Sequence, residues 1–127
     1  MVLAGYFFDM LKNAGDYHYI IQIGVKSIGH IAIIHRNAKT FEIQIIIGEK
    51  TYWGKGFGSE AIKPAVKTAF EKHGYKKACL EVRPDNIRAI RAYESCGFAR
   101  KGLKKYPNNK HQSVTLKMIL DKIDFKR

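Results

Sequence analysis

The stretch "YWGKGFGSEA" (residues 52–61) places glycine at every second position from Gly54 to Gly58, directly before a long amphipathic segment. Successive glycines let backbone N–H groups approach a ligand closely, and the first amides of a following helix lack intrahelical partners. Because the helix dipole favours negative charge at that end, the stretch suits a phosphate group. A turn that needs glycine only for its backbone angles is the alternative for the loop alone.

Two common nucleotide loops do not match this stretch. A P-loop requires Gly-Lys followed by Ser or Thr, but Gly54-Lys55 is followed by Gly56. A dinucleotide fingerprint requires G-x-G-x-x-G within a βαβ unit, with an acidic residue about 20 positions on. Here the spacing is G-x-G-x-G, and no such unit supplies the acidic residue. With both nucleotide loops excluded, the loop alone is compatible with a phosphate site for another ligand and with a turn that needs glycine only for its φ angles.

The residues before the loop predict three strands. Residues 17–23, 27–36 and 41–47 are rich in β-branched and aromatic side chains, and short turns separate them. Strands joined by such short turns form an antiparallel meander. After the loop, apolar residues recur at helical spacing from Ala61 to Phe70, so a helix is expected there, ending near Gly74.

The second half alternates between strands and one more helix. Residues 77–82 predict a strand, residues 87–95 predict a helix capped by Asp85 or Asn86, and 98–106 with 113–120 predict a closing antiparallel pair. The order is β-β-β-α-β-α-β-β. A strand, helix, strand unit makes strands 41–47 and 77–82 parallel, with a right-handed crossover. The expected class is α/β, with helices packed on a mixed (α+β) sheet.

Length and composition favour one domain over residues 1–127. No apolar run approaches the roughly 20 residues of a membrane span, and no signal peptide is evident, so a cytoplasmic protein without a membrane partner is expected. Two cysteines, Cys79 and Cys96, cannot form a zinc site alone, and no metal site is expected. The net charge of +12 falls mostly in residues 51–127, which hold 18 Lys/Arg against 7 Asp/Glu. Such a surface attracts polyanions, either nucleic acid or a phosphate-rich small molecule.

The loop and its surroundings resemble the GNAT N-acetyltransferase superfamily. That family's Q/R-x-x-G-x-G/A signature lies between a strand and a long helix, and here Trp53 replaces the usual Gln or Arg. A second matching feature, "LEVRPDNIRAIRAYESCGF" (residues 80–98), follows at the expected distance. "YWGKGFGSEAI" is similar to the ribosomal-protein N-terminal acetyltransferase branch. The resemblance implies a V-shaped splay between strands 41–47 and 77–82, and acetyl-CoA as cosubstrate.

The resemblance also implies roles for individual residues. The backbone of the strand end would bind the pantetheine arm as an added strand, the glycine loop would hold the pyrophosphate, Asn86 would bind the pantetheine, and an arginine would face the 3′-phosphate. The implied cofactor-binding residues are Ile45, Ile46, Ile47, Trp53, Gly54, Lys55, Gly56, Phe57, Gly58, Ser59, Asn86 and Arg91, with Arg88 as a second arginine. Tyr93 would protonate the leaving thiolate, and Glu42 is the candidate general base, with Glu49 second.

The chain departs from the family pattern at its start. The family opens with a strand and two helices, whereas sixteen residues precede Tyr17 here, and residues 5–15 are expected to be a remnant of the second helix. Strand 17–23 would then be an open edge, and either a homodimer partner covers it or the site is unusually open. The predicted function is acetyl transfer to a primary amine, either a peptide N-terminus or a small molecule. A basic nucleic-acid- or ribosome-binding protein and a non-catalytic acyl-CoA-binding protein are the alternatives, although nucleic acid is not the expected partner.

Overall fold

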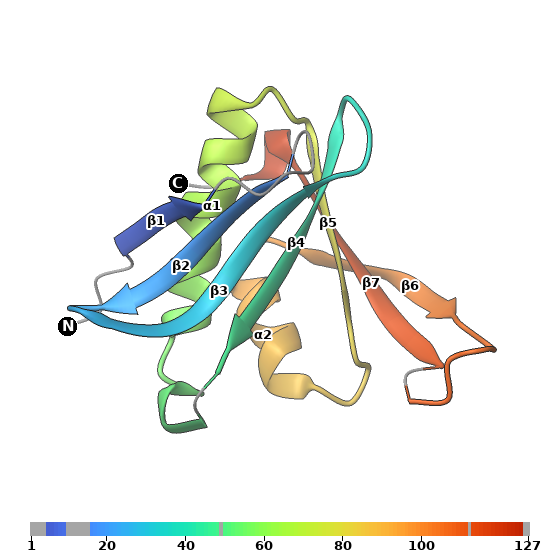
Figure 1. Cartoon of the computed structure of the whole chain (residues 1–127). Coiled ribbons are helices and arrows are strands. Elements are labelled where there is room, and N and C mark those ends of the chain that lie inside the picture. Colours follow the sequence, from blue (N-terminus) through green and yellow to red (C-terminus); the bar gives the residue numbers. More distant parts are fainter. Residues whose placement is uncertain (1–4, 10–15, 49, 112, 126–127) are drawn as a thin grey trace.

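The chain folds into one mixed sheet with two α-helices on one face (Figure 1). The computed structural model describes residues 5–9, 16–48, 50–111 and 113–125. The strands are β1 (Gly5–Asp9), β2 (Tyr17–Ile23), β3 (Lys26–His35), β4 (Thr40–Ile47), β5 (Lys77–Val82), β6 (Ala99–Lys105) and β7 (Val114–Asp121). The helices are α1 (Phe57–Lys72) and α2 (Ile87–Ser95), with short 3-10 turns at Lys50–Tyr52 and Lys122–Asp124. This arrangement confirms the predicted fold class.

The sheet order is β1-β2-β3-β4-β5-β7-β6, and every neighbouring pair is antiparallel except β4 and β5. The parallel pairs recorded between β4 and β5 run only from Thr40↔Lys77 to Glu42↔Cys79. Both strands continue beyond these pairs, β4 to Ile47 and β5 to Val82. The two strands therefore diverge, as Figure 1 shows, and the predicted splay is confirmed.

The start of the chain differs from the expectation. Residues 5–9 form strand β1, antiparallel to β2, rather than the start of a helix, and residues 10–15 lie outside the described part. The physical reason is that β2 offers a row of backbone donors and acceptors along its outer side, and a five-residue strand can pair with them. Strand β2 is therefore not the open edge of the sheet, and the predicted homodimer loses its basis.

The core lies between the sheet and α1, which packs on β3, β4 and α2. Helix α1 buries the apolar stripe that its sequence period predicts, namely Ala61, Ile62, Ala65, Val66, Ala69 and Phe70. Phe41 of β4 meets the Phe70 ring edge-on at a centroid distance of 5.5 Å. This contact holds the beginning of β4 against the C-terminal end of α1. Neither helix of the described part is long and apolar enough to cross a membrane.

Gly29 of β3 permits the close approach of β4, and this leads to a first prediction. A Cβ atom at Gly29 would lie well inside van der Waals contact of the Ile46 carbonyl oxygen, which belongs to backbone and cannot rotate away. We expect Gly29→Ala to lower the free energy of unfolding by about 1–3 kcal/mol in urea titrations, the usual range for overpacking. Gly48→Ala is the matched control, because its Cβ would lie 3.8 Å from the Ile28 carbonyl oxygen, an ordinary contact. Equal stability of the two variants would contradict this account.

Candidate functional site

The glycine loop leads directly into α1 at the wide end of the splay. Gly54 and Gly56 have φ angles of 74° and 84°, the left-handed region that glycine adopts without steric cost. Gly56 is the N-cap of α1, where no side chain caps the helix. The first recorded intrahelical bond runs from the Glu60 amide to the Gly56 carbonyl, so the preceding amides belong to the unpaired first turn. The loop thus has the conformation that the glycine spacing predicts.

A cavity of about 320 Å³ lies between the end of β4, the glycine loop and α2. Ten of the twelve sequence-predicted cofactor-binding residues line it, and Tyr93 joins them: Ile45, Ile46, Ile47, Trp53, Gly54, Gly56, Phe57, Gly58, Ser59 and Asn86. The end of β4 and the glycine loop are neighbours in the sequence, whereas Asn86 and Tyr93 of α2 follow only after α1 and β5. The fold therefore brings together the side chains and backbone that the two motifs single out.

Trp53 closes one side of this cavity. Its indole N–H donates a hydrogen bond to the Ile47 carbonyl at 2.8 Å, which holds the loop against the end of β4. The Arg88 guanidinium carbon lies 4.3 Å from the centroid of the Trp53 ring, a cation–π contact. Trp53, which replaces a Gln or Arg of the usual signature, thus positions both the strand end and a cation.

Two predicted cofactor residues, Lys55 and Arg91, are described by the structure but are not among those lining the cavity. Arg88 lines it instead of Arg91. Helical spacing explains why Arg88 and not Arg91 lines the cavity. Residues four positions apart lie on the same face of a helix, and the cavity face of α2 carries two such pairs, Arg88 with Ala92 and Ala89 with Tyr93. Arg91 falls outside this stripe. Arg88, the second arginine of the sequence analysis, is thus the one that lies at the cavity.

Tyr93 is a largely buried tyrosine at the α2 side of the cavity. Its ring packs edge-on against Phe98, with centroids 6.2 Å apart. Burial, with a smaller contribution from the nearby Cys96, raises the pKa of Tyr93 to about 12. The phenol therefore keeps its proton at neutral pH, as a proton donor must.

Asn86 occupies the N-cap of α2, where its side-chain oxygen accepts a hydrogen bond from the Ala89 amide at 3.3 Å. This confirms one of the two predicted caps. Because the oxygen serves the helix, the side-chain NH₂ group is the part of Asn86 that suits a ligand acceptor. Ser59 in turn links the helices, since its hydroxyl lies 3.2 Å from that of Ser95.

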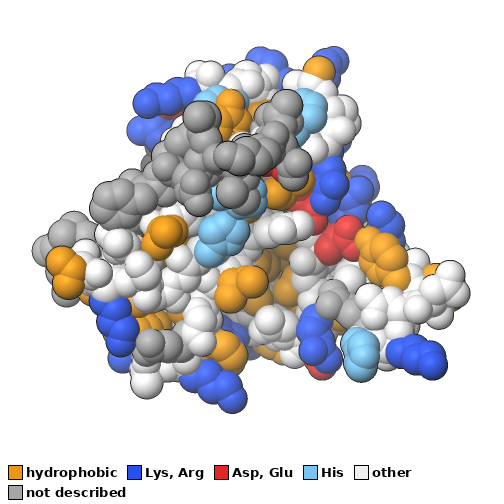
Figure 2. Space-filling model, in the orientation of Figure 1, with side chains coloured by type: hydrophobic (Ala, Val, Ile, Leu, Met, Phe, Trp, Pro, Cys, Tyr) orange, Lys and Arg blue, Asp and Glu red, His pale blue; other side chains and the backbone are white. Residues whose placement is uncertain are grey.

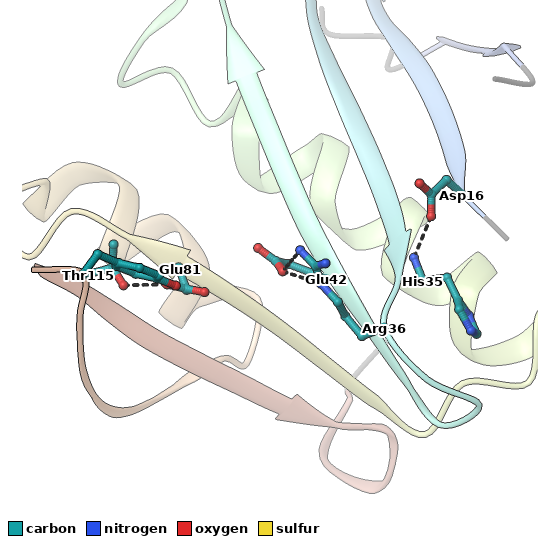
Figure 3. Close-up of polar contacts among 7 residues, drawn as sticks. Asp16, His35, Arg36, Glu42, Glu81 and Thr115 are labelled. Atoms are coloured by element: carbon teal, nitrogen blue, oxygen red, sulfur yellow. Dashed lines mark hydrogen bonds and ion pairs between the residues drawn. The ribbon is translucent and has the colours of Figure 1, made fainter. Parts of the chain in front are cut away.

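Glu42 lies apart from Tyr93. It belongs to the last paired rung of β4 and β5, and its carboxylate accepts from Arg36 Nε at 2.8 Å and from Arg36 Nη2 at 2.5 Å. Figure 3 shows Glu42 on β4 and Arg36 just beyond the end of β3, separate from Glu81 on β5 and Thr115 on β7. Glu42 lines a second cavity rather than the one that contains Tyr93. Glu49, the second candidate base, lies outside the described residues.

Sequence reasoning missed a polar cluster formed by Glu81 of β5, Thr115 of β7 and Tyr106, which directly follows β6. The hydroxyls of Tyr106 and Thr115 donate to the same Glu81 oxygen at 2.5 Å and 2.6 Å. Burial would raise the pKa of Glu81, but these hydrogen bonds and the nearby lysines outweigh it, so the pKa lies below its usual value. Alternation along β5 predicts that Glu81 and Cys79 share the face opposite the buried Leu80. It does not predict the hydrogen-bond donors of Glu81, because these belong to other segments of the chain.

The comparisons with known proteins agree with this geometry. The family described as acetyltransferase (GNAT) domain matches residues 3–99. The chain is 35% identical over 101 residues to spermidine N(1)-acetyltransferase of Vibrio cholerae, covering 77% of this chain and 56% of that protein. It is 32% identical over 66 residues to aminoglycoside N(6′)-acetyltransferase type 1 of Klebsiella pneumoniae, covering 52% of this chain and 33% of that protein. The chain thus spans about half or less of these curated relatives.

A solved structure also matches. The crystal structure of the Vibrio cholerae spermidine N-acetyltransferase in complex with CoA and spermine aligns with a TM-score of 0.76 and 25% identity. The alignment covers 87% of this chain and 68% of that one. These named relatives are spermidine and aminoglycoside acetyltransferases, not ribosomal-protein acetyltransferases, so the branch expected from the loop sequence is not supported.

Proposed function

Because the chain belongs to the acetyltransferase (GNAT) family, we propose that it transfers the acetyl group of acetyl-CoA to a primary amine. The observation that carries the proposal is the cavity that joins the glycine loop, the unpaired end of β4 and Tyr93. A loop suited to phosphate, a strand end with open backbone groups and a protonated phenol match the successive parts of acetyl-CoA. The names of the two relatives state that they acetylate spermidine and aminoglycosides, which favours a small molecule over a peptide N-terminus as the acceptor.

The reaction requires few groups from the protein. The neutral amine nitrogen attacks the thioester carbonyl carbon, a C–N bond forms and the C–S bond breaks. The amine loses one proton, to Glu42 or to water, and the departing thiolate gains one from Tyr93. The products are the acetylated amine and free coenzyme A. Positioning of the amine supplies much of the rate, and each proton transfer contributes about 10²–10⁴-fold.

Cys96 has no part in this scheme. It is buried at 5% exposure, and burial is the largest influence on its thiol, raising the pKa. A protonated, enclosed thiol is a poor nucleophile, so we propose direct transfer without an acetyl-cysteine. Cys79 and Cys96 are both free thiols.

Calorimetric titration with acetyl-CoA, followed by a thiol-release assay on a panel of amines, tests the proposal. Micromolar binding together with release of free coenzyme A in the presence of an amine supports the enzyme. Binding without thiol release from any amine would favour the acyl-CoA-binding alternative. Absence of binding at moderate salt would overturn both readings.

Asn86 offers a test that separates capping from cofactor binding. We expect Asn86→Ala to lower the free energy of unfolding by about 1 kcal/mol, because α2 loses its cap. Asn86→Asp keeps a good cap and should unfold like the wild type. Because aspartate has no NH₂ donor, we also expect it to bind acetyl-CoA about tenfold more weakly by calorimetry. If Asn86→Asp bound acetyl-CoA with wild-type affinity, Asn86 would act only as the cap of α2 and not as a cofactor ligand.

A further inference from the structure

A second cavity, of about 590 Å³, lies on the sheet face that α1 and α2 leave uncovered. In Figure 2, which views this face, Lys and Arg side chains border acidic ones on the right side. The cavity is lined by Glu42 and Cys79, the last recorded pair before β4 and β5 diverge, and by side chains of β6 and β7. The cavity therefore lies beside the point where the two strands diverge. The inference rests on the proposed function, with this cavity as the acceptor side.

The cavity carries more positive than negative side chains. Two carboxylates, Glu42 and Glu81, face four cations: Arg36, Lys77, Lys104 and Lys117. Arg36 is paired with Glu42, and Lys77 lies 4.0 Å from Asp121, which is not a lining residue. Lys104 and Lys117 are the other two cations, and Glu81 is the carboxylate nearest to them in the sheet. The Lys104 ammonium also lies 5.2 Å from the centroid of the Tyr106 ring, a cation–π contact that leaves its charge in the cavity.

The sheet register places these two lysines around Glu81. Lys117 of β7 is directly opposite Glu81 of β5, and Lys104 of β6 is opposite Thr115 of β7. The Glu81 carboxylate is already held by two hydroxyls, from Tyr106 and Thr115. The single negative charge of Glu81 thus balances only one of the two lysine charges, so the net charge around Glu81 is positive.

We propose that the acceptor is a small primary amine whose molecule also carries a carboxylate or a phosphate, and that Lys104 and Lys117 bind this anionic group. An anion between the two lysines forms charge-assisted hydrogen bonds and neutralises the excess positive charge. A polyamine would instead bring further positive charge into a cavity that already has an excess. The acceptor class therefore differs from the one that the name of the Vibrio cholerae relative states.

Matched pairs of amines test this in the thiol-release assay with the full chain. Lysine against 1,5-diaminopentane adds a carboxylate to the same alkyl amine, and phosphoethanolamine against ethanolamine adds a phosphate. We expect kcat/KM to be at least about tenfold higher for the anionic member of one or both pairs. The pair that shows the preference identifies carboxylate or phosphate as the recognised group.

The double variant Lys104→Gln plus Lys117→Gln removes the two charges. We expect KM for the preferred anionic amine to rise about tenfold, with the neutral or cationic partner changed less than twofold. Lys105→Gln is the matched control, because side chains alternate along β6 and Lys105 is not a lining residue. Unchanged calorimetric affinity for acetyl-CoA verifies that each variant is folded.

The outcomes separate the two proposals. The inference is supported if the wild type prefers the anionic amine of a matched pair, if the double variant loses this preference and if Lys105→Gln keeps it. Turnover of spermidine and the diamine with no gain from an anionic group would overturn the inference and leave the proposed acetyl transfer standing. An equal response of the double variant and Lys105→Gln would also overturn it. No thiol release with any amine would defeat acetyl transfer, and the inference with it.

Discussion

Gly56→Glu should abolish acetyl-CoA binding, with a dissociation constant at least about 100-fold above wild type, or roughly 2.7 kcal/mol. Gly56 has a φ angle of 84° at the N-cap of α1, and a Cβ there would meet no heavy atom within 4 Å. The glutamate would therefore fit without a clash but would project a carboxylate where the loop amides are proposed to bind phosphate. Like charges placed side by side repel each other. Calorimetric titration with acetyl-CoA measures the loss.

Gly74→Glu is the matched control for this prediction. Gly74 lies just beyond the other end of α1 with a φ angle of 77°, and a Cβ there would also meet nothing within 4 Å. Both variants pay about 1–2 kcal/mol for a side chain in the left-handed region. We therefore expect similar thermal unfolding of the two proteins, with binding lost only in Gly56→Glu. Wild-type affinity in Gly56→Glu would refute the phosphate role of the loop.

Tyr93→Phe should lower kcat by about 100-fold while the affinity for acetyl-CoA changes less than twofold. The substitution removes only the hydroxyl, which is the proposed proton donor to the thiolate, and a general acid contributes about 10²–10⁴-fold. Because the pKa of Tyr93 is raised to about 12, the wild-type phenol stays protonated as the pH rises through 10. Ionisation of Tyr93 should therefore cause no fall in kcat below that pH. Steady-state thiol release and calorimetry give the two quantities.

Tyr75→Phe controls for the loss of a tyrosine hydroxyl elsewhere in the core. The Tyr75 hydroxyl lies 2.7 Å from His35 Nδ1, and Tyr75 does not line the acetyl-CoA cavity. We expect this variant to lose about 1 kcal/mol of stability, the usual value of one hydrogen bond, and to keep its kcat. A kcat within threefold of wild type in Tyr93→Phe would reduce Tyr93 to a packing partner of Phe98.

Local patterns predicted most of the elements. Residues 17–23, 77–82 and 87–95 have the predicted bounds, because a side-chain period of two or 3.6 and a capping residue are properties of adjacent positions. The exception is the segment at residues 5–9, which is a strand because β2 offers it backbone partners. That pairing depends on another segment and leaves no mark in the local period.

The cofactor side of the site was equally accessible to sequence reasoning. Backbone amides, glycine angles and a helix N-cap are local features, so the glycine loop and Asn86 could be placed from their own neighbours. The choice between Arg88 and Arg91 was missed because it depends on which stripe of α2 faces β4. Glu42 was identified as a candidate base, but its partner Arg36 and its distance from Tyr93 were not foreseen.

The order of strands and helices, the parallel pair and the loop that suits a phosphate follow from short-range periodicity and glycine geometry, and they can be predicted from the amino-acid sequence. The set of side chains that meet around the splay depends instead on tertiary packing. Lys104, Lys117 and Glu81 lie on three strands, and their proximity depends on the register of β5, β6 and β7. A shift of one residue in that register would turn the side chains to the other face and separate the charges.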